Sequence, residues 1–164
     1  MKGFAVVSSL VVLAALAVSS PVGAAPVPGT TCEVFPANNV WNMNVSNLPV
    51  HPRSRAWMRS AHAGTTLLHP DFGGAPYGLP YDVVDGSHET VDVDFRYADE
   101  SDPGPYPFGP DIQVEGGSDE HALMVNTDTC TLSELYDAHW NRGDPDAGSG
   151  AVFHLGSNEL RPRG

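Results

Sequence analysis

The densest group of reactive side chains lies in residues 97–117, YADESDPGPYPFGPDIQVEGG. Asp99, Glu100 and Asp102 fall within four residues there, so their carboxylates can converge. Paired carboxylates act as acid and base, or as acid and nucleophile, in glycoside cleavage. We therefore take these three residues as candidate catalytic groups. The alternatives are a calcium site built from the same oxygen ligands and a solvated surface loop in which aspartates cap turns.

His121 is the fourth candidate catalytic residue. It directly follows Asp119 and Glu120, and it opens a predicted strand just beyond the acidic loop. A neighbouring carboxylate orients an imidazole and favours its charged form, which suits an acid/base or ligand role. The alternative is a partly exposed histidine at the end of a strand.

A second group combines aromatic rings with an imidazole and a carboxylate. Rings stack on sugar faces and carboxylates accept hydrogen bonds from sugar hydroxyls, so this group predicts binding of a polysaccharide substrate. The predicted substrate-binding residues are His69, Asp71, Tyr77 and Tyr106. Tryptophans could add to such a groove or belong to the core: Trp41, Trp57 and Trp140.

Standard catalytic and ligand motifs are absent from the sequence. It contains no His-Glu-x-x-His metalloprotease motif, no phosphate-binding glycine-rich loop and no nucleophile elbow. The run Asp144-x-Asp146-x-Gly148 is similar to a calcium loop but lacks its third oxygen ligand and its terminal glutamate. We therefore assign no metal ligands and no cofactor from the sequence.

The charge balance narrows the classes of partner. The chain has 20 Asp and Glu against 8 Lys and Arg, a net charge of -12. Nucleic acids and anionic membranes require clustered positive charge, so both are excluded as partners. An acidic surface suits metal ions and neutral or cationic polymers. Nothing in the sequence indicates an oligomeric state.

The first residues predict export. Lys2 supplies a positive start, residues 4–18 are almost entirely apolar, and small residues stand at 22–25. We expect a signal peptide over residues 1–24, a leader over 25–34 and a single β-rich domain over 35–164. The released protein would be extracellular and would have no membrane contact after cleavage. In an exported chain the two cysteines, Cys32 and Cys130, predict a disulfide.

The residue pattern predicts a mostly β fold: antiparallel hairpins in a sandwich or jelly-roll-like domain with one short helix. The helix is expected over residues 55–63, with Ser54 as its cap. Alternation predicts one hairpin from residues 78–84 and 89–97, with Val91, Val93 and Phe95 on one face. A second hairpin is expected from residues 121–126 and 130–138, and a last strand from 151–155.

Several long segments resemble one family of proteins. They are FPANNVWN, LPVHPRS, LHPDFG, YGLPYDVV, YADESDPGPYP, EGG, TCTLSELYDA and AGSGAVFHLGSN. Together they resemble an uncharacterised family of exported proteins common in actinobacteria and related soil bacteria, over nearly all of the chain beyond the signal peptide. The resemblance implies no activity. It implies that members continue past the SNELRP region, so that this chain is similar to the N-terminal part of such a protein. The chain would then be either a short member of the family or one whose domain is truncated at the C-terminus.

These observations predict a secreted carbohydrate-active protein of the hydrolase type with its site in the acidic loop. One alternative is a non-catalytic secreted module that binds carbohydrate or a cation, or has a structural role. Another is a truncated, inactive member of the family. The sequence leaves open whether the protein is an enzyme.

Overall fold

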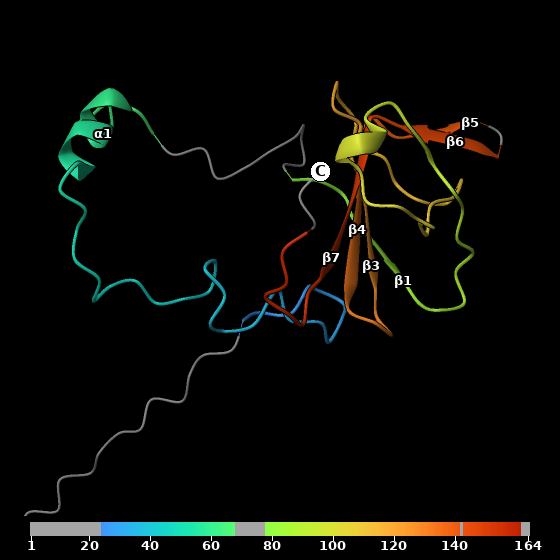
Figure 1. The fold of residues 1–164 in the computed structure, drawn as a ribbon, viewed down its shortest axis with the longest axis horizontal. Coiled ribbons are helices and arrows are strands. Elements are labelled where there is room, and N and C mark those ends of the chain that lie inside the picture. The colour runs from blue at the N-terminus through green and yellow to red at the C-terminus, as the bar shows by residue number, and fades with distance from the viewer. Residues whose placement is uncertain (1–23, 68–77, 142, 162–164) are drawn as a thin grey trace, which may run out of the picture.

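The computed structural model describes residues 24–67, 78–141 and 143–161, which form two β-sheets (Figure 1). The predicted signal peptide, residues 1–24, lies outside the described residues except for Ala24. The four-stranded sheet has the order β1-β3-β4-β7: β1 (Asp82–Val84), β3 (Ala122–Asn126), β4 (Thr131–Tyr136) and β7 (Ser149–His154). The three-stranded sheet has the order β2-β6-β5: β2 (Asp94–Phe95), β6 (Asp144–Ala147) and β5 (His139–Asn141). The prediction of a mostly β fold is confirmed.

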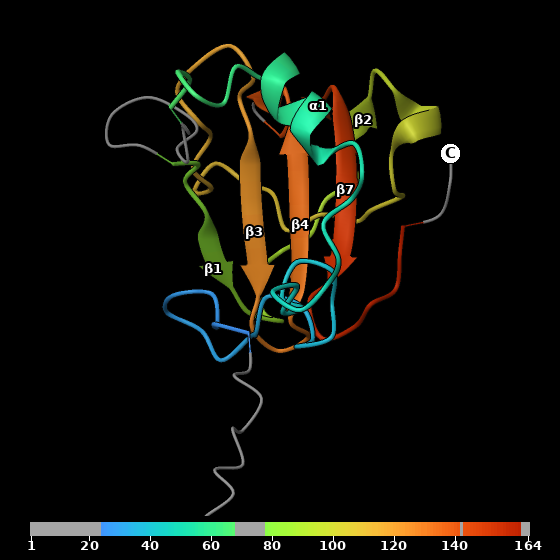
Figure 2. The ribbon, with the colours of Figure 1, turned by 90° about the vertical axis from the view of Figure 1, so that its left-hand side faces the viewer.

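The second predicted hairpin is confirmed and forms the centre of the larger sheet. Strands β3 and β4 pair antiparallel from Ala122↔Leu135 to Asn126↔Thr131. The predicted last strand, β7, pairs antiparallel with the other edge of β4. Figure 2 shows this sheet face-on, with β3 and β4 between β1 and β7.

The first predicted hairpin does not form, and both sheets are mixed. Strand β1 pairs parallel with β3, and β2 pairs parallel with β6. The turn after β1 is held toward the β3–β4 turn, because Gly86 N–H donates to the Asp128 carboxylate at 2.9 Å. The chain after this turn does not return along β1 but continues to β2 in the second sheet. There Val91, Val93 and Phe95 pack against the core with the alternation that the sequence predicts.

The main core lies where the two sheets meet the acidic loop. Its largest fully buried side chains are Tyr106, Phe108, Met124 and Leu135. The Tyr106 ring packs edge-on against Phe95, with 5.5 Å between ring centroids. A Cβ at Gly150 would lie 2.5 Å from the Tyr106 hydroxyl oxygen and 2.6 Å from the Phe95 ring, so β7 approaches this pair too closely for any side chain.

The helix is shorter than predicted and lies apart from the sheets (Figure 1). It is α1 (Ser54–Ser60), preceded by Arg53 as the N-cap residue, so Ser54 does not cap it and no side chain does. None of its residues is buried. The only other described helix is the 3-10 turn η1 (Ala98–Glu100). Neither described helix is long and apolar enough to cross a membrane.

The predicted disulfide between Cys32 and Cys130 is confirmed. It joins the segment after residue 24 to the β3–β4 turn, and Figure 2 shows this segment at that end of the sheet. Cys32 is buried in a small second core with Val125 and Leu155. The leader is not an extended tail here, because Val27 N–H donates to the Cys32 carbonyl at 2.8 Å.

Replacing both cysteines (Cys32→Ser with Cys130→Ser) should lower the free energy of unfolding by roughly 3–5 kcal/mol, because the crosslink closes a long loop in the unfolded chain. The two cysteines are 98 residues apart in the sequence. Urea unfolding followed by tryptophan fluorescence measures the change, and reduced wild-type protein is the control. A loss below about 1 kcal/mol would contradict a stabilising disulfide.

Candidate functional site

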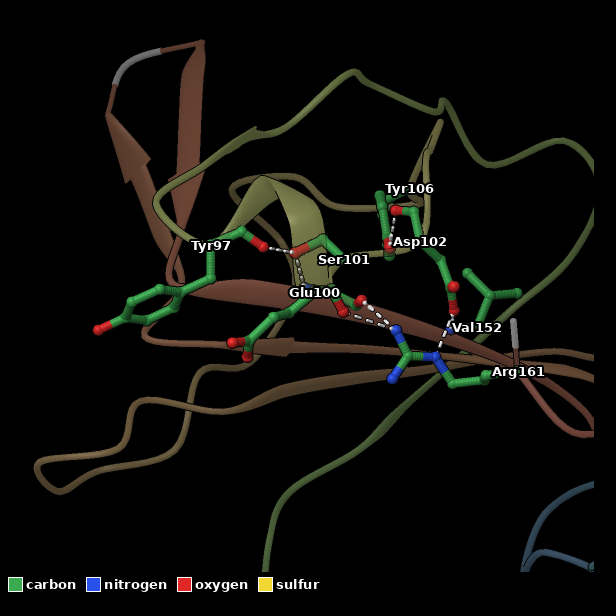
Figure 3. A network of polar contacts seen from close by, with 8 residues as sticks. Tyr97, Glu100, Ser101, Asp102, Tyr106, Val152 and Arg161 are labelled. Atoms are coloured by element: carbon green, nitrogen blue, oxygen red, sulfur yellow. Dashed lines mark hydrogen bonds and ion pairs between the residues drawn. The ribbon is translucent and has the colours of Figure 1, made fainter. Parts of the chain in front are cut away.

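Asp102 attaches the acidic loop to β7 (Figure 3). Its carboxylate accepts hydrogen bonds from Val152 N–H at 2.8 Å and from Arg161 Nε at 2.6 Å. Its backbone N–H donates to the Gly150 carbonyl at 3.0 Å. Burial opposes ionisation of this carboxyl group, but the bonds from Arg161 and Val152 outweigh it and lower the pKa of Asp102. A carboxylate held ionised and doubly bonded is suited to anchoring the loop and poorly suited to donating a proton.

Tyr106 supports Asp102 from the core side. Its hydroxyl donates to the Asp102 carbonyl at 2.7 Å, and its side chain is fully buried. Burial, together with the nearby charge of Asp102, raises the pKa of Tyr106 to about 12, so the hydroxyl stays protonated and keeps donating. The structure therefore gives Tyr106 no access to a substrate and places it in the core.

The carboxylates of Glu100 and Asp102, two members of the predicted catalytic set, do not point toward one another. Asp99 and Glu100 lie on η1 and are exposed. In Figure 3 the Glu100 carboxylate points away from that of Asp102, and only the Glu100 carbonyl meets Arg161, at 3.1 Å. The acidic loop thus presents two solvated carboxylates beside one that Arg161 neutralises.

His121 pairs with Glu115 rather than with the three carboxylates. Its Nδ1 donates to the Glu115 carboxylate at 2.7 Å, and the Glu115 N–H donates back to the His121 carbonyl at 2.7 Å. The Glu115 side chain is only 10% exposed, so this pair fixes the end of the acidic loop to the start of β3. Sequence proximity to Asp119 and Glu120 pointed to the wrong partner.

Glu134 is a partly buried carboxyl group that the sequence did not single out. It lies on β4 between Leu123 of β3 and Ala151 of β7. Burial raises the pKa of Glu134, and the charges of His121 and Arg161 only partly offset this effect. In the sequence it appears as an ordinary polar residue of an alternating strand, so no local signal marks it.

A groove runs past His88 on the other side of the acidic loop. Three hollows of about 570, 270 and 250 Å³ adjoin there, and His88 lines all of them. The largest of the three hollows is also lined by two acidic residues and a tryptophan: Glu89, Asp111 and Trp140. Its volume falls in the range of small-molecule binding sites.

The His88 imidazole has a defined orientation in this groove. Its Nδ1 lies 2.8 Å from the Glu89 carbonyl, which can only accept, so this nitrogen carries a proton. Its Nε2 faces the Asp111 carboxylate at 3.4 Å. The His88 side chain is 18% exposed and that of Asp111 is 69% exposed. A largely buried imidazole therefore faces a carboxylate that is in contact with solvent. Trp140 packs edge-on against Phe108, which fixes the indole at the groove.

The sequence did not identify His88, Glu89 or Asp111 as site residues. Asp111 belongs to the acidic loop, but its partner His88 is 23 positions earlier, and no spacing rule connects them. The predicted substrate-binding residues His69, Asp71 and Tyr77 lie outside the described residues. Of the tryptophans, Trp140 lines the groove, whereas Trp41 and Trp57 are exposed elsewhere.

Comparison of the chain with protein-family models, with curated proteins and with solved structures found no match. The resemblance to exported actinobacterial proteins therefore stays a prediction. Function has to be inferred from the groove and its surroundings.

Replacing the anchoring carboxylate (Asp102→Asn) should lower the free energy of unfolding by about 1–3 kcal/mol, because Arg161 loses a charged acceptor in a partly buried place. Denaturant unfolding measures the loss. The matched control Asp99→Asn removes an exposed carboxylate and should change stability by less than about 0.5 kcal/mol. Equal effects of the two changes would contradict the anchoring role.

The effect of Asp102→Asn should depend on pH in one direction. Because the folded-state pKa of Asp102 lies below its ordinary value, its stabilising contribution is complete above that ordinary value. The contribution disappears as pH falls through the lowered folded-state pKa. The stability difference between wild type and Asp102→Asn should therefore shrink in acid, and a difference that grew in acid would contradict the assignment.

Glu134→Gln should stabilise the protein at neutral pH. The folded-state pKa of Glu134 is raised, so ionisation costs stability above that raised pKa and costs nothing below the ordinary one. The melting temperature of the variant should exceed that of wild type at pH 7, and the difference should vanish in acid. Glu159→Gln, an exposed glutamate, is the control. A less stable Glu134→Gln variant at pH 7 would show that the pairing with His121 or Arg161 dominates instead.

Proposed function

We propose that this is a secreted protein that binds a neutral polysaccharide in the groove at His88. One observation carries the proposal: a tryptophan, a histidine and two acidic residues line a single hollow of about 570 Å³, namely Trp140, His88, Glu89 and Asp111. The combination of a flat apolar surface with several hydrogen-bonding groups fits the two faces of a sugar ring.

Each group has a defined task in this proposal. Trp140 stacks on a sugar face, and the carboxylates of Glu89 and Asp111 accept hydrogen bonds from hydroxyl groups. His88 presents Nε2 beside Asp111, because Nδ1 is engaged by the Glu89 carbonyl. A hydroxyl bound between Asp111 and His88 can donate to the carboxylate and interact with the imidazole at the same time.

The overall charge favours a neutral glycan over an anionic one. The net charge is -12, and two carboxylates line the groove itself. Uronic-acid or sulfated polymers would be repelled by this field, whereas neutral glucans and chitin would not. The predicted signal peptide and the Cys32–Cys130 disulfide support an extracellular location, where such polymers are found.

Binding is favoured over the hydrolase function that the sequence suggested. A glycoside hydrolase of the usual kind needs a carboxylic acid of raised pKa opposite a second carboxylate. In the predicted catalytic set, the pKa of Asp102 is lowered, Asp99 and Glu100 are solvated, and His121 is engaged by Glu115. Amide substitutions at Asp99 and Glu100 are therefore expected to leave glycan binding unchanged.

Retention on insoluble glucan and chitin tests the proposal. Trp140→Ala should weaken binding about tenfold, the equivalent of a lost aromatic contact. Asp111→Asn should also weaken binding while leaving the fold intact, because this side chain is 69% exposed. The controls are Trp57→Ala and Asp99→Asn, which remove an exposed tryptophan and an exposed aspartate that do not line the groove.

Circular dichroism separates loss of fold from loss of binding, since Trp140 also packs against Phe108. Absence of wild-type binding to every neutral glycan, or equal binding by Asp111→Asn and wild type, would overturn the proposal. Preferred binding to an anionic glycan such as alginate would contradict the charge argument.

A further inference from the structure

Three side chains of metal-ligating type gather away from the groove: Glu120, Asp137 and His139. Glu120 lies two residues before β3, Asp137 follows β4, and His139 is the first residue of β5. One ligand atom from each lies within 4.8 Å of the others, and all three side chains are partly exposed. An ion could therefore reach the set from solvent.

The two segments are held together by backbone bonds as well as by side chains. Asp137 N–H donates to the Asp119 carbonyl at 2.8 Å, and Ala138 N–H donates to the Glu120 carbonyl at 3.0 Å. His139 Nε2 lies 3.1 Å from Asp137 Oδ1, and His139 Nδ1 lies 3.5 Å from Glu120 Oε2. The His139 imidazole thus lies between the carboxylates of Asp137 and Glu120, and backbone hydrogen bonds join the two segments that carry these carboxylates.

We infer that Glu120, Asp137 and His139 form a binding site for a divalent transition-metal ion, with Zn²⁺ as the best match. Zn²⁺ takes imidazole nitrogen and carboxylate oxygen at about 2.0–2.2 Å, which places the ligand atoms of a tetrahedral site about 3.4 Å apart. The ligand atoms already lie within 4.8 Å of one another, but the two carboxylates face different nitrogens of the ring. Binding of one ion therefore requires one carboxylate side chain to rotate toward the nitrogen that binds the metal. An imidazole in the set favours Zn²⁺ over Ca²⁺ and Mg²⁺, which prefer oxygen ligands alone.

Arg96 holds the carboxylate of Asp137, one of the three proposed ligands, in place. It forms an ion pair with Asp137 Oδ2, which leaves Asp137 Oδ1 directed at His139. Ligating carboxylates in metal sites are themselves held by hydrogen bonds in this way. Three protein ligands would leave a further position for water, as in open zinc sites.

The metal site is separate from the proposed glycan groove. His139 and Trp140 are consecutive on β5, and consecutive residues of a strand point to opposite faces. Trp140 lines the groove, so His139 faces away from it. Failure of glycan binding would therefore leave the metal inference standing, and the reverse also holds.

Calorimetric titration of the exported chain, disulfide intact and treated with EDTA, with Zn²⁺ tests the inference. Wild type should bind one Zn²⁺ per chain, and millimolar Ca²⁺ or Mg²⁺ should not displace it. His139→Gln and Glu120→Gln should each weaken binding at least about tenfold, because each removes a ligand. His154→Gln and Glu159→Gln are matched controls, since both residues are exposed and lie outside the set.

Co²⁺ substitution gives a second, independent measurement. The wild-type protein should show visible absorption bands of a low-coordinate Co²⁺ ion, and His139→Gln should lose them. The inference is overturned if wild type binds no Zn²⁺, if the two ligand variants bind it as tightly as the controls, or if Ca²⁺ displaces it. Any of these results would identify the set as a charge cluster linking His139 to its two carboxylates.

Discussion

The structure depends on the contact between the acidic loop and β7, made through Tyr106 and Asp102. The Tyr106 ring fills the core beside Phe95, and its hydroxyl holds the Asp102 carbonyl. The Asp102 carboxylate then accepts from Val152 and Arg161, so one short segment joins the core, a strand and a distant arginine. Gly150 makes this contact feasible, because any side chain there would collide with Tyr106.

That anchor explains how the rest of the loop can form one wall of a groove. Beyond Asp102 the loop turns back and pairs with Val91, whose N–H and carbonyl exchange hydrogen bonds of 2.8 Å with Tyr106. This pairing places Asp111, further along the loop, opposite His88. The acidic residues near η1 and Asp111 are therefore parts of one loop with different tasks. Asp102 attaches the loop to β7, and Asp111 lines a ligand-sized hollow.

Features that depend on neighbours in the chain were predictable from the sequence. The β3–β4 hairpin follows from two apolar stretches around a short turn, and the alternation of Val91, Val93 and Phe95 gives their buried face. The disulfide followed from the predicted signal peptide and an even number of cysteines. The parallel pairings of β1 with β3 and β2 with β6 were not predictable, because they join segments with no local signal of contact. Strands β5 and β6 were missed because Gly143 and Pro145 are typical of turns.

The site was only partly predictable for the same reason. Composition drew attention to the acidic loop, but the state of each carboxylate depends on residues far away in the sequence. Arg161 stands 59 positions after Asp102 and turns a candidate catalytic group into an anchor. His88 had no recognisable partner in the sequence, and only the folded loop brings Asp111 to it.

The proposed ligand site lies at Asp111 of this loop and at His88, rather than at Asp99, Glu100 and Asp102. Nuclear magnetic resonance titration of the ¹⁵N-labelled protein with a soluble neutral oligosaccharide tests it most directly. The Trp140 indole signal and the amide signals of His88, Glu89 and Asp111 should shift, with little change at η1. Shifts centred on Asp99, Glu100 and His121, with an unaffected Trp140, would contradict it.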